Sequence, residues 1–264
     1  ASTGAGVASA EPHNGWMLRR VAAVAVGVWL AGTLGAFILA VVRVQRFRQA
    51  MRWATPARAA LQEEAAMIAR RIGLRRCPEV WLLPVDISPM LWAVLGRAQL
   101  LFPARLLEGL APGARRAIVL HELAHLRRGD HYVRLLEAAA TIVYWWHPAV
   151  WWARRELHFA EEECCDSWVV SEMPEDRGVY AAALIDTERF LSESRLPMPA
   201  IASGVQGFMA MKRRVTTIML MRGEGPSRLS PVGRAALLAL AAVCLPLVPM
   251  RAQIREGTES PAAA

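Results

Sequence analysis

An uncharged apolar run near the N-terminus, from Val21 to Val42, constrains this 264-residue chain more than any other feature. A run of this length can cross a bilayer core of about 30 Å as a helix. It is too long for the apolar core of a secretory signal peptide and lacks a convincing small-residue cleavage site. We therefore expect a transmembrane helix over residues 19–44, preceded by an extracytoplasmic tail over residues 1–18.

A second apolar run, from Ala235 to Met250, is shorter and contains Pro246 and Pro249. Its length is near the lower limit for a span, so a second transmembrane helix over residues 231–250 competes with a buried core helix. With a span at each end, residues 45–230 form a domain between them. Residues 251–264 then form a second extracytoplasmic tail.

The net charge of +8 is better explained by orientation in a membrane than by a nucleic-acid-binding surface. Lys212 is the only lysine, the arginines are spread along the chain, and no groove-reading motif accompanies them. More basic residues flank the inner side of each apolar run than the outer side. By the positive-inside rule, residues 43–234 face the cytoplasm. We therefore expect a multi-pass protein of the inner membrane. Its expected partner is the lipid bilayer, and no direct nucleic-acid binding is expected.

The string His121-Glu122-Leu123-Ala124-His125 is a complete H-E-x-x-H inside a predicted helix that begins near Pro112 and ends near Gly129. Residues four apart share a helix face, so the two imidazoles can point at one metal ion. Glu122 is the next residue after His121 on this helix, and its carboxylate can reach a water at the metal. Two surface histidines on an ordinary helix would give the same string, so the rest of the chain must decide.

A third metal ligand is sought downstream, because a catalytic zinc normally has three protein ligands and one open position. Glu162 and Asp166 lie four apart in a glutamate-rich segment that runs into an apolar turn. One of them can bind the metal while the other hydrogen-bonds the far nitrogen of a liganding histidine. His158 shares their helix face and is a rival ligand.

The stretch from Leu135 to Trp152 is nearly long enough to span a membrane and is rich in tryptophan. If it crossed the bilayer, every later residue would lie on the opposite side from the H-E-x-x-H helix. A downstream ligand would then be unreachable. We therefore expect an interfacial or re-entrant hydrophobic hairpin over residues 135–152, with both flanks cytoplasmic.

Local signals predict the remaining elements of a mainly helical domain with a small β element. Helices are expected from Thr55-Pro56 to Gly73, from Asp130 as a cap towards Trp146, from Pro148 to about Ser171, from Pro174 to Ser194 and from Met211 to Met221. Strands are expected at Val80–Leu83 and Gln99–Phe102, with a loop or irregular hairpin at Ile87–Arg97 and a flexible loop at 195–209. The pair Arg213-Arg214 is expected on a helix surface or at the membrane face.

Three stretches, HELAHLRRGD, WWHPAVWWARREL and EECCD, resemble the BlaR/MecR type of antirepressor membrane zinc metallopeptidase, and the similarity extends over about residues 20–250. Members of that family are gluzincins with H-E-x-x-H followed by E-x-x-x-D. The resemblance implies a mainly α (α+β), gluzincin-like peptidase domain flanked by transmembrane helices. It implies His121, His125 and Glu162 as Zn²⁺ ligands. Glu122 would be the general base, and Asp166 would support a ligand.

The resemblance also implies a zinc metalloendopeptidase that cleaves a cytoplasmic protein, often a transcriptional repressor, in signal transduction, and that can cleave itself. The sequence leaves the donor to the oxyanion open among Tyr132, Tyr144, His147 and Arg128. The run Ala98–Phe102 is a candidate strand edge for holding substrate.

Two alternatives stay open at this point. One is a protease of the CAAX-processing or heat-shock gluzincin type. The other is a non-catalytic signal transducer that keeps zinc for stability, against which the carboxylate of Glu122 argues.

Overall fold

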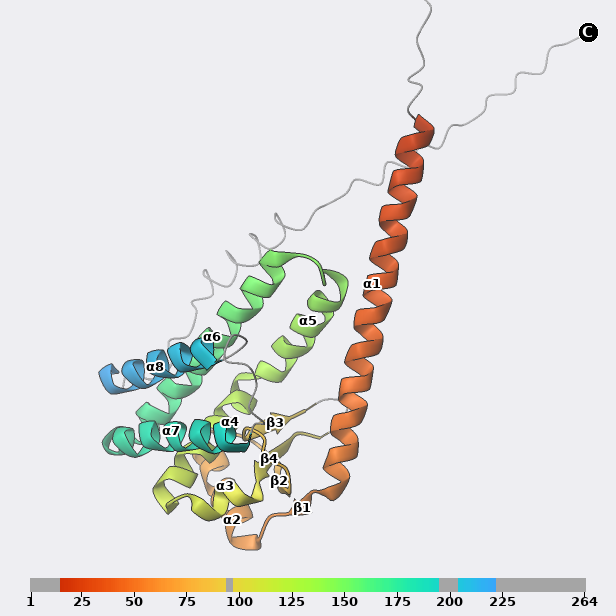
Figure 1. The fold of residues 1–264 in the computed structure, drawn as a ribbon. Coiled ribbons are helices and arrows are strands. Elements are labelled where there is room, and N and C mark those ends of the chain that lie inside the picture. The colour runs from red at the N-terminus through yellow and green to blue at the C-terminus, as the bar shows by residue number, and fades with distance from the viewer. Residues whose placement is uncertain (1–14, 94–96, 195–203, 222–264) are drawn as a thin grey trace, which may run out of the picture. The chain divides into compact units, whose positions relative to one another are not determined.

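The computed structural model describes residues 15–93, 97–194 and 204–221. The described chain is mostly helical and contains one small four-stranded sheet (Figure 1), which confirms the expected mainly helical architecture with a small β element. The apolar run Ala235–Met250 lies outside the described residues, and the second transmembrane helix stays a prediction.

The first helix, α1 (Gly15–Ala50), contains the uncharged run and continues beyond the expected boundary at residue 44. Among the described residues, the segment Arg19–Trp53 is the one helix long and apolar enough to cross a membrane. Its side chains are largely exposed, as expected of a helix whose surroundings are lipid rather than protein.

The sheet has the strand order β1-β2-β4-β3. Its strands are β1 (Thr55–Pro56), β2 (Glu79–Leu83), β3 (Met90–Trp92) and β4 (Gln99–Pro103), of which β2 and β4 pair in parallel while β1 and β3 join as antiparallel edges. The expected strand edge at Ala98–Phe102 is therefore wrong. The stretch Ile87–Arg97 was expected to be a loop or an irregular hairpin, and the hairpin alternative is confirmed because β3 pairs antiparallel with β4. This pairing makes β4 an interior strand.

The predicted helix start at Thr55-Pro56 is also wrong. These two residues form the edge strand β1, where a proline is tolerated because its missing N–H can face away from the ladder, and helix α2 (Ala59–Arg71) begins later. The short helix α3 (Ala104–Gly109) follows β4 directly.

Helix α4 (Pro112–Arg128) is the central element of the domain. Every residue from Ala117 to His125 is buried, which identifies a helix surrounded on all sides. It packs against α2 on one side and against α6 and α7 on the other. Pro112 occupies the first turn, and Gly129 ends the helix with a left-handed φ of 82°, as the sequence predicted.

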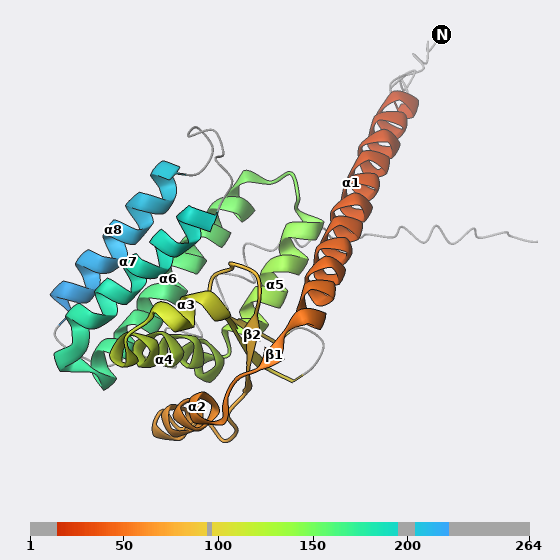
Figure 2. The same ribbon diagram turned by 60° about the horizontal axis from the view of Figure 1, so that its bottom comes forward.

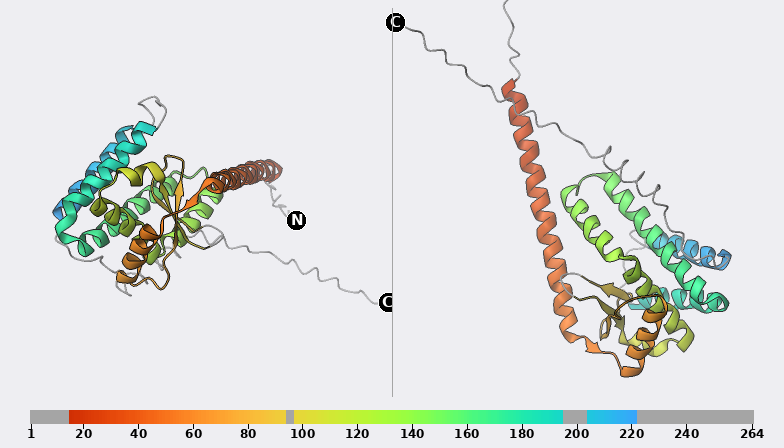
Figure 3. Two further views of the ribbon diagram at one scale, coloured as in Figure 1. Left: turned by 90° about the horizontal axis from the view of Figure 1, so that it is seen from below. Right: turned by 180° about the vertical axis from the view of Figure 1, so that it is seen from behind.

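The remaining helices are α5 (Asp130–Val143), α6 (Pro148–Glu172), α7 (Arg177–Ser194) and α8 (Gly204–Leu220). Helices α5 and α6 form a hairpin that turns at residues 144–147, and α8 packs against both α6 and α7 (Figures 2 and 3). Residues 204–209, expected in a loop, are helical, and residues 195–203 lie outside the described part of the chain.

Candidate metal centre

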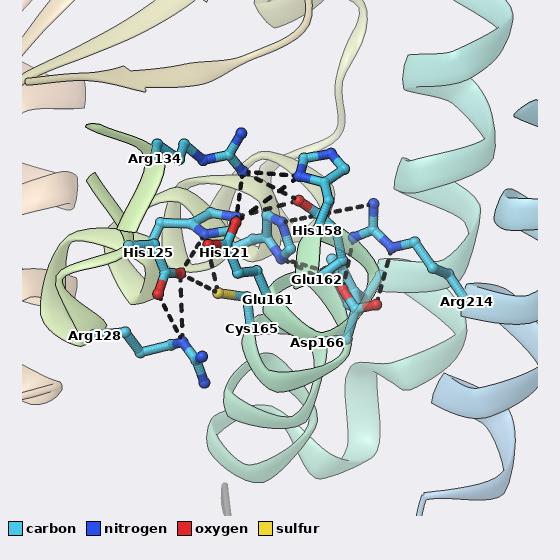
Figure 4. A network of polar contacts seen from close by, with 12 residues as sticks. His121, His125, Arg128, Arg134, His158, Glu161, Glu162, Cys165, Asp166 and Arg214 are labelled. Atoms are coloured by element: carbon cyan, nitrogen blue, oxygen red, sulfur yellow. Dashed lines mark hydrogen bonds and ion pairs between the residues drawn. The ribbon is translucent and has the colours of Figure 1, made fainter. Parts of the chain in front are cut away.

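Two helices bring together three side chains that could hold a metal ion (Figure 4). His121 and His125 come from α4 and Glu162 comes from α6, and one ligand atom from each lies within 4.8 Å of the other two. The Nε2 atoms of His121 and His125 lie 3.3 Å and 3.6 Å from the two carboxylate oxygens of Glu162. Both imidazoles therefore present the same nitrogen to one shared space.

The outward nitrogen of His121 is held by a hydrogen-bond relay that the sequence did not reveal. Its Nδ1 lies 2.8 Å from the hydroxyl of Tyr180, and that hydroxyl donates to Asp166 Oδ1 at 2.5 Å. Asp166 Oδ1 itself is 3.4 Å from Nδ1, so the tyrosine makes the closer contact. Because the hydroxyl donates to Asp166, it accepts from Nδ1–H, so Nε2 is the nitrogen that could bind a metal once its own proton is lost.

The outward nitrogen of His125 is held by Asp130, whose Oδ2 lies 2.7 Å from Nδ1. The expectation that Asp130 caps α5 is wrong: Gly129 occupies the cap position, and the buried Asp130 side chain turns back to α4, where Arg128 also donates to it. Cys165 Sγ lies 3.3 Å from the same nitrogen. These three groups are close enough to hold a metal, but we interpret them as support for His125 because a hydrogen bond already joins Nδ1 to the carboxylate.

Arg214 of α8 neutralises the acidic side of the cluster. It donates to both oxygens of Asp166, at 3.0 Å and 2.7 Å, and lies 2.9 Å from Glu162 Oε2. Its side chain is only 16% exposed, so the expected surface position is wrong for Arg214. Its neighbour Arg213 does lie on the surface, paired with Glu163.

Burial and charge pairing set the ionisation of the cluster. Burial opposes the charged form of His121, but hydrogen bonds to Asp166 and Glu162 outweigh it and raise its pKa to about 9. Burial would raise the pKa of Glu162, yet His121 and Arg214 hold it well below its usual range. Burial raises the pKa of Glu122. A negative carboxylate facing two buried imidazoles is an environment that favours a bound cation.

A cavity of about 470 Å³ opens onto the cluster. It is lined by Glu122, by Arg134 of α5, by His158 of α6 and by the edge strand β3 with its preceding residues. The four residues that the sequence offered as oxyanion donors, Tyr132, Tyr144, His147 and Arg128, are not among the described residues that line it. No sequence pattern pointed to Arg134.

Arg134 is a second cation beside the cluster. Its Nη2 lies 3.9 Å from Glu162 Oε1 and 3.1 Å from the buried Glu161 carboxylate. The rival ligand His158 lies outside the three-residue group, half-exposed, with Nδ1 at 3.2 Å from the same Nη2.

Comparison with known proteins gives two matches. The family model described as BlaR1 peptidase M56 matches residues 4–218. The Regulatory protein BlaR1 of Bacillus licheniformis is 22% identical over 143 residues, which are 54% of this chain and 24% of that protein. The matched region therefore spans about a quarter of that relative's length.

Proposed function

Because the chain belongs to the BlaR1 peptidase M56 family, we propose that it is a membrane-anchored zinc metalloendopeptidase with a regulatory role. The observation that carries this proposal is the cluster of His121, His125 and Glu162 beside the carboxylate of Glu122. A metal kept only for stability would not need a cavity or a further carboxylate beside its ligands. The family match also favours this reading over a CAAX-processing or heat-shock protease.

The donor set fits zinc. Two imidazole nitrogens and one carboxylate are a common ligand set of catalytic zinc, and the outward nitrogens are already engaged by Tyr180 and Asp130. A zinc ion held there supplies Lewis-acid chemistry, lowering the pKa of water and polarising the scissile carbonyl. We assign Asp166 to the support of His121 through Tyr180, rather than to direct metal binding.

Glu122 is the proposed general base. Its carboxylate is buried beside His121 and lines the cavity, so it can accept a proton from the attacking water and return it to the leaving amine. Arg134 is the proposed donor to the oxyanion that develops on the scissile carbonyl, because its guanidinium lines the same cavity close to Glu162.

The substrate is proposed to be a protein segment in an extended conformation. Strand β3 is an edge of the sheet, and Met90 and Leu91 line the cavity, so backbone groups of a substrate can pair with it. The basic residues flanking α1 favour a cytoplasmic position for this domain, and a cytoplasmic transcriptional repressor is our proposed substrate class. Self-cleavage, which the family resemblance implies, stays a prediction.

The substitution Glu122→Gln tests the proposal. In the purified full chain, reconstituted in lipid, we expect zinc to remain bound at one ion per chain while cleavage of a quenched fluorescent peptide library is lost. Glu188→Gln is the matched control, since Glu188 lines the same cavity from α7 and has no assigned role. Full proteolysis by the Glu122→Gln protein would refute the catalytic assignment. A wild-type chain that binds no zinc would refute the metal assignment.

A further inference from the structure

The hairpin of α5 and α6 exposes large apolar side chains that no described part of the protein covers. Leu136 is 71% exposed and Trp152 is 65% exposed, and others of the same kind surround them: Leu135, Tyr144, Trp146 and Trp151. An apolar surface of this extent on a single chain marks an interaction site. The question is what covers it.

The tip of the hairpin contacts α1, and these contacts indicate what covers the exposed side chains. The indole Nε1 of Trp29 donates to the carbonyl of Val143 at the tip of the hairpin, at 2.9 Å. Gly32 faces Trp145 so closely that a Cβ at this glycine would lie 2.2 Å from the Trp145 ring. Trp29 and Gly32 both belong to the uncharged run Val21–Val42. The hairpin tip therefore lies beside the interior of that run and not beside its charged end.

We propose that the α5–α6 hairpin is re-entrant: it enters the bilayer beside α1, its exposed side chains contact acyl chains, and it turns back within the hydrocarbon. The inference rests on α1 as the membrane anchor of the proposed function. From Trp29 to Val42 there are 42 − 29 = 13 residues, which at about 1.5 Å each correspond to about 20 Å of depth. With a hydrocarbon core of about 30 Å, the tip passes the bilayer midplane, which is deeper than an interfacial helix reaches.

Several backbone polar groups at the turn have side-chain partners, which a segment in lipid needs. The indole of Trp151 donates to the carbonyl of Trp145 at 3.0 Å, so Trp151 and Trp29 each cover one carbonyl near the end of α5. At the start of α6, the side chain of His147 accepts from the N–H of Ala149 at 3.2 Å. In water these groups would need no such partners.

The two charged side chains nearest the tip of the hairpin are paired with each other. Glu137 of α5 and Arg154 of α6 form an ion pair at 2.5 Å, and the guanidinium of Arg154 lies 5.8 Å from the ring centre of Trp151. Arg155, one residue nearer the metal centre, lies over the ring of Phe159 and can extend towards the headgroups. Charged residues inside membranes pair with one another in this way because an isolated charge there is costly.

Photolabelling of the full chain in phosphatidylcholine vesicles tests the inference. One vesicle preparation carries a diazirine at the end of an acyl chain and the other carries it on the headgroup, and adducts are mapped by mass spectrometry. We expect the acyl-chain probe to label residues 138–153 as well as α1, and to leave the exposed Met67 of α2 unlabelled.

Labelling of the hairpin by the headgroup probe alone overturns insertion, as does cross-linking of the hairpin to a second copy without any lipid adduct. In both cases α1 still reacts with the acyl-chain probe, so the membrane anchor stands while the re-entrant hairpin falls. Absence of acyl-chain adducts on α1 overturns the anchor and the hairpin together.

Gly32→Val supplies a variant with a matched control. The added side chain collides with Trp145, so we expect acyl-chain adducts on the hairpin to fall about fivefold or more relative to those on α1, as an overpacked contact predicts. Gly35→Val adds the same side chain where a Cβ meets nothing within 4 Å, and should label as the wild type does. Equal hairpin labelling in the two variants contradicts the placement of the tip beside Gly32.

Discussion

Tyr180 gives the most direct test of how the metal centre is supported. Replacing it with Phe keeps the buried ring and removes only the hydroxyl that joins His121 to Asp166. Asp166 keeps the two donors of Arg214, so its carboxylate stays satisfied. The Nδ1–H of His121 loses its nearest acceptor, and the remaining one, Asp166 Oδ1, is 3.4 Å away.

The size of the effect follows from that geometry. A buried donor left without an acceptor costs about 1–3 kcal/mol, and partial closure of the gap to Asp166 should keep the cost in the lower half of the range. If a cost of about 1–2 kcal/mol falls on the metal-bound state, zinc binds about 5- to 30-fold more weakly. Loss of partners that hold liganding histidines typically has a comparable effect.

Zinc affinity of the metal-free chain, measured by competition with a chromophoric chelator, is the assay. Tyr132→Phe is the control, because its ring is 70% exposed and its hydroxyl has no place in the cluster. A thermal unfolding curve of each metal-free protein shows whether the core is intact. The reasoning fails if Tyr180→Phe binds zinc within about twofold of the wild type, since hydrogen-bond removal would then have no consequence at the metal.

Three further predictions concern the same centre. Asp166→Ala leaves the buried Arg214 without its main partner, so the free energy of unfolding in urea should fall by about 3–5 kcal/mol. The control Arg189→Ala breaks an exposed ion pair and should leave the free energy of unfolding nearly unchanged. Arg134→Gln should lower kcat by about 100- to 1,000-fold with zinc content retained, while Arg155→Gln, outside the cavity, should not; a drop confined to KM would contradict a role in the transition state. Chelation of zinc should lower the unfolding free energy by about 3 kcal/mol when free zinc had stood at about 100 times its Kd, and an unchanged Tm would argue against a native site.

The sequence predicted the parts of the centre that depend on helical spacing. His121 and His125 share a face of α4 because four residues make about one turn, and the same spacing aligns Glu162 with Asp166 on α6. The limits of α4 were also predictable, since Pro112 and Gly129 act through their own backbone geometry. Local rules therefore predicted both helices that carry the candidate ligands.

The partners of these ligands depend on packing between distant segments. Tyr180 and Arg214 come from α7 and α8, and no local pattern marks either residue as buried beside α4. Asp130 was misread because an acid at the start of a helix usually serves as a cap, and here tertiary contact with His125 takes precedence. The strand order was missed for a similar reason, since the parallel pairing of β2 with β4 joins segments that are not sequence neighbours.

Gly129 links the helix of the metal ligands to the helix that leads into the hairpin. The backbone of this single residue sets the angle between them, and the 14 residues of α5 act as a lever about 20 Å long. A rotation of about 10° at Gly129 therefore moves the far end of α5 by about 3–4 Å. Conversely, a displacement of that size at the far end of α5 corresponds to a rotation of only about 10° at Gly129, next to the helix that carries the candidate ligands. The leverage that makes the hairpin sensitive to its surroundings thus protects the geometry of the metal centre.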